Sequence, residues 1–381
     1  CIRDSNNTII IVSFFMKNYL DFEKEIKALE QEVDNLKSPF GSEGISEVDT
    51  NQIKSTQEEI NQKLQEVYSN LNSWQKTQVA RHEDRPKANF YIKKIFSKFT
   101  LLSGDRYFGE DKAVTAGFGL IENKSVLVIG QEKGEDLNSR IERNFGMMRP
   151  EGYRKCIRLM KLAERFQIPV VSFIDTPGAY PGIDAEQRGQ ASAIANSIET
   201  CMSLTVPNIS IIIGEGGSGG AIALASSNKV IMLENSIYSV ISPEGCASIL
   251  WRDPSKSLQA AEAMKLTASD LLKLKIIDDV IQEPLGGAHR DPEMIAGDIK
   301  HSIIKSLKFF EKYSKDEIYD HRKAKFLQIG RDQGIGKATG LSGDDLSYKA
   351  SSFKKLKSHI CLLYTSPSPR DRTRSRMPSS A

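Results

Sequence analysis

The chain has 381 residues, of which 39% are hydrophobic and 27% charged, a composition typical of globular proteins with about two or three domains. Lys plus Arg total 52 and Asp plus Glu total 49, and the small excess of basic residues comes from the Arg-rich last 21 residues. Without these residues the chain has no net charge. It therefore lacks the basic surface on which nucleic-acid-binding and membrane-surface proteins depend, so we expect neither a nucleic acid nor a membrane as a partner.

Cysteine and histidine spacing argues against disulfides and metal sites. The five cysteines form no CxxC pair and are odd in number, which indicates a reducing compartment. The five histidines show no HExxH or HxxxH spacing, so we expect no metal in this chain. No apolar run reaches the roughly 18 residues that a membrane helix needs. We interpret residues 1–15 as a non-native leader, 331–360 as a C-terminal extension and 361–381 as an artefactual or disordered tail.

The first patterned region is helical. Apolar residues recur every three or four positions in two stripes, one from Phe22 to Leu36 and one from Ile53 to Trp74. The polar segment 41–51 joins them, so the two helices can pack as an antiparallel hairpin. We interpret residues 16–85 as a docking or dimer-stabilising hairpin that carries no chemistry.

From Ala113 the pattern becomes that of an α/β fold. Alternating residues at 114–118 and 126–129 predict a β-hairpin. Continuous β-branched runs, each following a helical stretch, predict parallel strands that are buried on both faces. The expected order after the hairpin is helix 150–166, strand 169–174, helix 187–204, strand 209–213, helix 221–227, strand 230–233, helices 260–264 and 268–274, strand 279–281 and helix 292–312.

Two of the predicted strands end in glycine-rich segments, 175–182 and 214–220. Ligands of open α/β sheets bind at the carboxyl ends of strands, so both segments are candidate sites. The second runs into the helix predicted to begin near Ala221. Its backbone N–H groups and the helix dipole can therefore hold an oxyanion without a side chain, as an oxyanion hole requires.

The second segment also fits a dinucleotide-binding fingerprint. Gly214-x-Gly216-x-x-Gly219 has the required spacing, and Glu234 follows about 20 residues later, where a ribose-binding acid would stand. The segment lies deep in the chain and has more glycines than that fingerprint needs. A nicotinamide-dependent oxidoreductase is therefore kept as an alternative.

A third motif in the same segment is the nucleophile elbow of serine hydrolases. Gly216-x-Ser218-x-Gly220 fits it, but a hydrolase would also need an acid and one of the downstream histidines, none of which has a distinctive neighbourhood. A small residue tolerated in a tight turn is the simpler interpretation of Ser218. A serine hydrolase is the other alternative.

Nearby charged residues also have structural interpretations. Asp175 precedes Thr-Pro-Gly and fits a loop-capping carboxylate better than a general base. Glu215 and Glu244 fit structural or solvated carboxylates. A cluster of three arginines could grip an anionic ligand, although a solvated face is the usual explanation; it consists of Arg143, Arg149 and Arg154.

Taken together, six segments resemble the alpha subunit of the bacterial acetyl-coenzyme A carboxylase carboxyltransferase. They are RNFGM from Arg143, PEGYRK from Pro150, FIDTPGAYPG from Phe173, GEGGSGGA from Gly214, YSVISPEGCASILW from Tyr238 and PLGGAHR from Pro284. The likeness runs from about Met16 to Gly330, and Met148 stands where many relatives have proline.

The resemblance implies a crotonase-like α/β fold of repeated ββα units in residues 86–330, after the helical hairpin. It implies transfer of a carboxyl group from carboxybiotin, on the biotin carboxyl carrier protein, to acetyl-coenzyme A, which gives malonyl-coenzyme A for fatty acid biosynthesis. It further implies a cytoplasmic heterotetramer of two alpha and two beta subunits. The beta subunit would hold zinc and coenzyme A, and a partner biotin carboxylase would use ATP.

The resemblance also implies roles for the glycine-rich segments. Negative charge develops on the biotin ureido oxygen as CO2 leaves, and donors aimed at that oxygen stabilise the transition state. The implied donors are the backbone N–H groups of Gly219 and Gly220. The remaining residues of the implied biotin pocket are Gly178, Ala179, Tyr180, Gly216, Gly217 and Ala221.

Overall fold

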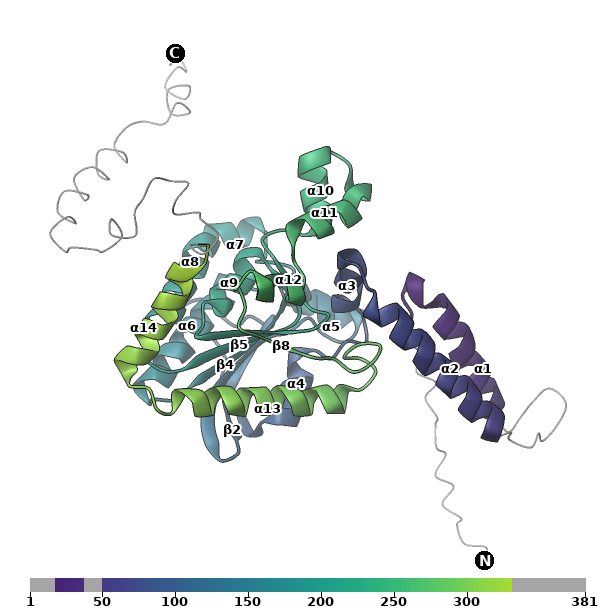
Figure 1. Ribbon diagram of the computed structural model, residues 1–381. Helices are drawn as coiled ribbons and strands as arrows, with labels where there is room; N and C mark the ends of the chain where they lie inside the picture. Colours follow the sequence, from purple (N-terminus) through teal and green to yellow (C-terminus); the bar gives the residue numbers. More distant parts are fainter. Residues whose placement is uncertain (1–17, 38–49, 331–381) are drawn as a thin grey trace, which may run out of the picture. The chain divides into compact units, whose positions relative to one another are not determined.

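One mixed β-sheet forms the centre of the computed structural model, which describes residues 18–37 and 50–330 (Figure 1). Its strands are β1 (Ser97–Leu101), β2 (Val114–Ile121), β3 (Lys124–Gln131), β4 (Val170–Thr176), β5 (Asn208–Gly217), β6 (Lys229–Leu233), β7 (Ile237–Ser239) and β8 (Asp279–Ile281). The order across the sheet is β1-β2-β3-β4-β5-β6-β8, and β7 pairs with the end of β5. The pairs β1–β2 and β2–β3 are antiparallel, and all other pairs are parallel.

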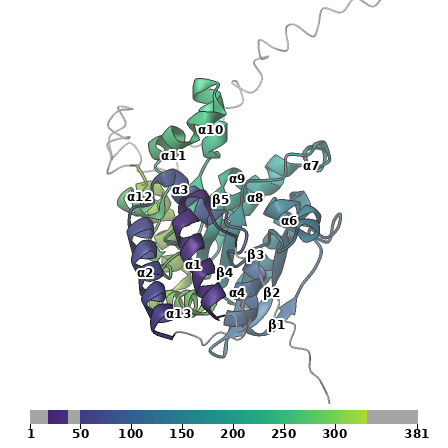
Figure 2. The same cartoon turned by 90° about the vertical axis from the view of Figure 1, so that its right-hand side faces the viewer.

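The helices lie around this sheet and in the N-terminal region (Figures 1 and 2). The N-terminal helices are η1 (Asp21–Glu23), α1 (Lys24–Lys37), α2 (Thr50–Ser69), α3 (Ser73–Ala80) and α4 (Ala88–Ile95). Those of the central region are α5 (Leu137–Glu142), η2 (Asn144–Gly146), α6 (Pro150–Arg165), α7 (Ile183–Gln187), α8 (Gln190–Ser203) and α9 (Ser218–Ala225). The last are α10 (Pro243–Trp251), η3 (Pro254–Lys256), α11 (Ser257–Met264), α12 (Ala268–Lys273), α13 (Pro292–Phe310) and α14 (Lys315–Gln328).

Two hydrophobic layers cover the two faces of the sheet. In β4, Val171 and Phe173 pack with the residues of α4 and α13, while Val170 and Ile174 pack with those of α6, α8 and α9. Successive side chains of a strand point to opposite faces, so a strand covered on both sides is mainly apolar. The predicted α/β class and buried parallel strands are confirmed.

The N-terminal hairpin is also confirmed, with a different end. Ile26 and Val33 of α1 pack against Ile60 and Leu64 of α2. The stripe predicted to continue to Trp74 is wrong beyond Ser69, because α3 is a separate helix, and Trp74 packs in a different cluster beside α11.

The break before α3 has a local cause in Asn72. Its side chain accepts a hydrogen bond from Gln75 N at 2.8 Å, and the Gln75 side chain accepts one from Asn72 N at 3.0 Å. This reciprocal capping box starts a new helix instead of extending the old one.

The glycine-rich segment 214–220 is built differently from the predicted loop. β5 continues to Gly217, and α9 begins at Ser218, three residues before the predicted start. The predicted helix 187–204 is likewise two helices, separated at Gly189, whose φ of 82° lies in the left-handed region that glycine favours. Most of the predicted hairpin linker and the segments 1–15, 331–360 and 361–381 lie outside the described residues.

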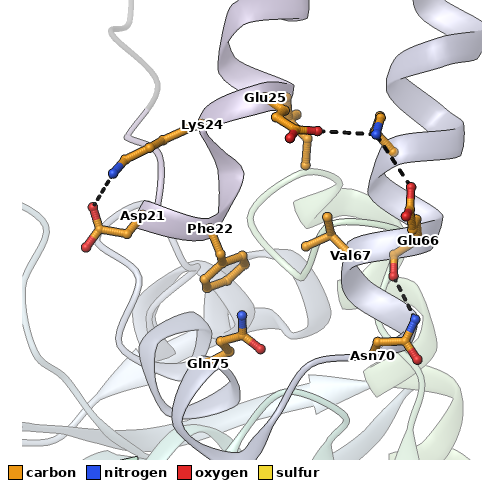
Figure 3. Close-up of a pocket in the computed structure, with 10 residues that line it drawn as sticks. Asp21, Phe22, Lys24, Glu25, Glu66, Val67, Asn70 and Gln75 are labelled. Carbon is orange, nitrogen blue, oxygen red and sulfur yellow. Dashed lines mark hydrogen bonds and ion pairs between the residues drawn. The ribbon is translucent and has the colours of Figure 1, made fainter.

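A cavity of about 550 Å³ lies between η1, the start of α1, the end of α2 and α3 (Figure 3). Phe22 and Val67 lie at its centre, and the Lys63 ammonium pairs with the Glu25 carboxylate at 3.2 Å. None of its lining residues comes from the two glycine-rich segments, so it is separate from the candidate site. Within the described ranges, no helix is long and apolar enough to cross a membrane.

Candidate functional site

The two glycine-rich segments meet backbone to backbone at the carboxyl ends of β4 and β5. A Cβ placed on Gly217 would lie 2.1 Å from the carbonyl oxygen of Pro177. A Cβ placed on Gly220 would lie 2.5 Å from the carbonyl carbon of Gly178 and 2.6 Å from its oxygen. Both distances are far below van der Waals contact, so only glycine allows this approach.

The helix that follows β5 presents backbone donors at this meeting point. α9 begins at Ser218, which has a φ of +49°, and no side chain caps its first turn. The first N–H groups of an α-helix have no partner within the helix and carry partial positive charge. This end of α9 can therefore bind an oxyanion through its backbone.

Two buried glutamines hold the segments in place, and the sequence analysis missed both. Gln131 Nε2, at the end of β3, donates to the carbonyl oxygen of Gly220 at 2.8 Å. Gln190 Nε2, at the start of α8, donates to the carbonyl oxygens of Met148 and Tyr180 at 2.9 Å each. No spacing in the sequence distinguishes these glutamines, because their partners come from distant segments.

The turn after β4 is capped by Thr176 and not by Asp175. Thr176 Oγ1 donates to the carbonyl oxygen of Gly178 at 2.6 Å and accepts a hydrogen bond from Gly178 N at 3.2 Å. The Asp175 carboxylate is buried, pairs with Lys133 Nζ at 2.8 Å and accepts a hydrogen bond from Glu215 N at 3.0 Å. The loop-capping interpretation of Asp175 is therefore wrong, because its partners lie on β5 and beyond β3.

Glu215 and Glu244 are joined by one guanidinium, which supports their structural interpretation. Arg81 Nη2 lies 2.6 Å from Glu215 Oε1, and Arg81 Nη1 lies 2.6 Å from Glu244 Oε1. Burial by itself lowers the pKa of Arg81, but the two carboxylates raise it above its ordinary value. One positive charge therefore pairs with both carboxylates.

The predicted arginine cluster does not converge on one ligand. Arg143 Nη1 donates to the carbonyl oxygen of Lys112 at 2.9 Å, and Arg154 Nε pairs with Asp105 Oδ2 at 2.7 Å. Only the guanidinium of Arg149 reaches the site segments, where it stacks 4.5 Å from the centre of the Tyr180 ring. These arginines are close in sequence but separated in space, because Arg143 follows α5, Arg149 precedes α6 and Arg154 lies within α6.

The hydrolase and dinucleotide motifs lack the partners that they need. Ser218 is exposed, and in the part of the chain that the structure describes no histidine forms a hydrogen bond with it. His289 stacks instead on His82, with 3.9 Å between ring centres. Glu234 accepts a hydrogen bond from Glu283 N at 3.2 Å, where β6 lies beside β8.

Ser218→Ala should therefore leave the carboxyl transfer expected from the sequence within about threefold of the wild-type rate, because its hydroxyl has no partner that could activate it. Loss of a nucleophilic serine would instead cost about 10⁶ in kcat. The measurement is the initial rate of that reaction in the complex with the expected beta subunit. Labelling of Ser218 by a fluorophosphonate would contradict this expectation.

Comparison with known proteins agrees with this geometry. The family described as "Acetyl co-enzyme A carboxylase carboxyltransferase-like" matches residues 19–330. The chain belongs to this family. It is 68% identical over 320 residues to the acetyl-coenzyme A carboxylase carboxyl transferase subunit alpha of Pelagibacter ubique, covering 84% of this chain and 87% of that protein. It is 52% identical over 315 residues to the subunit alpha of Zymomonas mobilis, and the match covers 83% of this chain and 100% of that protein.

A solved structure of the transcarboxylase 12S hexamer is also similar, with 18% identity, a TM-score of 0.49 and coverage of 59% of this chain and 41% of that one. Membership of the carboxyltransferase family confirms the predicted enzyme class and function of the chain. The mixed sheet and the helices that cover it agree with the α/β fold expected from the sequence. The oxidoreductase and hydrolase alternatives find no support.

Proposed function

We propose that this chain supplies the biotin half of a carboxyltransferase site that moves a carboxyl group from carboxybiotin to acetyl-coenzyme A, giving malonyl-coenzyme A for fatty acid biosynthesis. The observation that carries the proposal is the uncapped start of α9, held against the turn after β4 by glycine contacts. Backbone donors fixed in this way need no reorganisation as negative charge develops.

The proposed donors are the N–H groups of Gly219 and Gly220. A Cβ placed on Gly219 would meet only Ile194, at 3.6 Å, and one on Gly178 would meet nothing within 4 Å, so the surface here has room for a ring. The small residues therefore fit a biotin group, which supplies the transferable carboxyl and an oxygen on which charge develops. The proposed lining residues are Gly178, Ala179, Tyr180, Gly216, Gly217 and Ala221.

An exposed apolar face supports the proposed partner, a beta subunit in a heterotetramer of two alpha and two beta chains. α10 and α11 project from the sheet in both views (Figures 1 and 2), and Ile249 and Leu250 of α10 are 70% and 62% exposed. Large exposed apolar surfaces mark sites of protein association. α10 closely follows β7 in the chain, and β7 pairs with Gly216 and Gly217. The exposed face of α10 therefore belongs to the segment that leads away from the proposed biotin site.

The remaining components are proposed to be divided among the chains. Residues 86–330 would form the carboxyltransferase domain, and residues 16–85 a docking hairpin. The beta subunit would hold zinc and coenzyme A; the described part of this chain contains no group of three His, Cys, Asp or Glu residues that could bind a metal. The biotin carboxyl carrier protein and an ATP-using biotin carboxylase would complete the complex. The free, buried thiols of Cys156 and Cys201 support a reducing compartment, the cytoplasm.

The function is tested by following transfer from malonyl-coenzyme A to biocytin, the reverse reaction. We expect turnover from the purified complex with the beta subunit and none from this chain alone. Negative charge develops on both biotin and the coenzyme A substrate, and this chain provides hydrogen-bond donors only for the biotin oxygen. Robust turnover by the isolated chain would contradict the proposed division of the site.

A further inference from the structure

Five charged side chains form a continuous line beneath the proposed biotin site. The line runs from Asp175, near the end of β4, to the Lys133 ammonium at 2.8 Å, and from there to Glu215 Oε2 on β5 at 3.5 Å. Arg81 continues it from Glu215 to Glu244 on α10. Lys133 is the member that joins the ends of β4 and β5, and it follows the end of β3 by two residues.

The line lies at an irregularity between β4 and β5. Ile174 pairs with Ile212, but Thr176 pairs with Gly216, so β5 contains two more residues than β4 between these pairs. The extra stretch includes Glu215, whose N–H donates to Asp175 Oδ1 at 3.0 Å. A side-chain carboxylate therefore replaces a strand partner where the register shifts. Gly217, which contacts the turn after β4, lies two residues further along β5.

The same carboxylate oxygen that receives the Glu215 N–H also receives the Lys133 ammonium. Without that ammonium, two largely buried carboxylates would face each other, and like charges in a low-dielectric site repel strongly. Burial alone lowers the pKa of Lys133, but Asp175 and Glu215 raise it above its ordinary value, so the lysine remains charged. Lys133 therefore maintains the spacing of β4 and β5 at this point.

We propose that Lys133 is a positioning residue for carboxyl transfer: by pairing with both Asp175 and Glu215, it sets the distance between the two glycine-rich segments and so the direction of the Gly219 and Gly220 N–H groups. The inference rests on the proposed function. The other charged groups around Asp175 are Arg85 and Lys87, both before α4, and Glu132, just after β3, while Arg81 faces Lys133.

The test compares Lys133→Met with Lys124→Met in the complex with the beta subunit. Lys124 begins β3, at the far end from Lys133, and forms an exposed ion pair with Glu311, so its loss is a matched control. The first readout is amide hydrogen exchange of a peptide covering residues 216–221, which does not depend on activity. We expect exchange to become about tenfold faster in Lys133→Met and to stay at the wild-type rate in Lys124→Met.

The second readout is kcat against pH, in complexes shown to be folded by their unfolding midpoints. Lys133→Met should lose about 10- to 100-fold in kcat at pH 8, since misplaced oxyanion donors are costly. The loss should shrink as the pH falls, because a proton on Asp175 removes the repulsion. Lys133→Met/Asp175→Asn should recover most of the loss, since Asn keeps an oxygen for the Glu215 N–H without the charge.

Lys133→Arg keeps the positive charge and provides a test even if Lys133→Met does not assemble. We expect a several-fold lower kcat with an unchanged unfolding midpoint, because the guanidinium changes the spacing and not the charge. Wild-type kcat and exchange in the folded Lys133 variants would overturn the inference, as would a pH-independent loss that Asp175→Asn does not relieve. Failure of the wild-type complex to transfer would overturn the proposed function instead, and the exchange result would still decide the positioning role.

Discussion

Gly220→Val should lower kcat for carboxyl transfer by about 10² to 10³, the usual cost of losing an oxyanion donor. Its Cβ would overlap the backbone of Gly178, at 2.5 Å from the carbonyl carbon, and 2.9 Å from Ala179 N. Backbone atoms cannot rotate away as a flexible side chain can, so the two segments must separate. The N–H groups at the start of α9 would then no longer point at the ligand. The measurement is kcat of the complex, with folding checked by the unfolding midpoint.

Two glycine variants serve as comparisons for this prediction. Gly297 lies in α13 with nothing within 4 Å of its Cβ position, so Gly297→Ala should keep the wild-type kcat. Gly219→Ala should cost less than about tenfold, because its Cβ would make only an ordinary contact with Ile194 at 3.6 Å and leave the backbone donor in place. Equal losses in Gly219→Ala and Gly220→Val would show that backbone overlap is not the cause.

Arg85→Met should destabilise the chain by about 3 to 5 kcal/mol, the cost of leaving one member of a buried ion pair alone. Arg85 Nη2 and Nη1 donate to the two oxygens of Glu283 at 2.5 and 2.9 Å, and the side chains are 1% and 0% exposed. Arg85 Nε also donates to the carbonyl oxygen of Ile213 in β5, at 2.7 Å. The substitution removes all three bonds and leaves Glu283 buried as an unpaired anion. Denaturant unfolding of the chain measures the loss.

The double variant Arg85→Met/Glu283→Met separates the charge from the packing. We expect it to recover much of the stability, because it removes both buried charges. Burial raises the pKa of Glu283, but Arg85 holds it below the ordinary value of 4.5. The stability from this carboxylate is therefore full above pH 4.5 and is lost as the pH falls through its lower folded pKa. A single variant as stable as the wild type would contradict the assigned role of the pair.

The sequence alone identified the helical hairpin, the parallel strands and the glycine-rich segments. Periodicity is a local property, and a strand buried on both faces shows a run of apolar residues, which is why the strand predicted at 230–233 lies within β6. The family resemblance followed from whole segments such as FIDTPGAYPG. The helix break at Asn72 also has a local signal, the capping box of Asn72 and Gln75. The prediction missed it because the apolar stripe continues past this point.

The tertiary structure decided which polar side chains support those segments. Asp175 had the features of a turn cap, yet its carboxylate pairs with Lys133, 42 residues earlier in the chain, and with the backbone of Glu215. Gln131 and Gln190 gave no signal at all, because each bonds to a carbonyl oxygen brought to it by a different strand or helix. A buried polar group must find a partner wherever the packed elements place one, and that placement depends on the sheet order and register, which local sequence patterns do not contain.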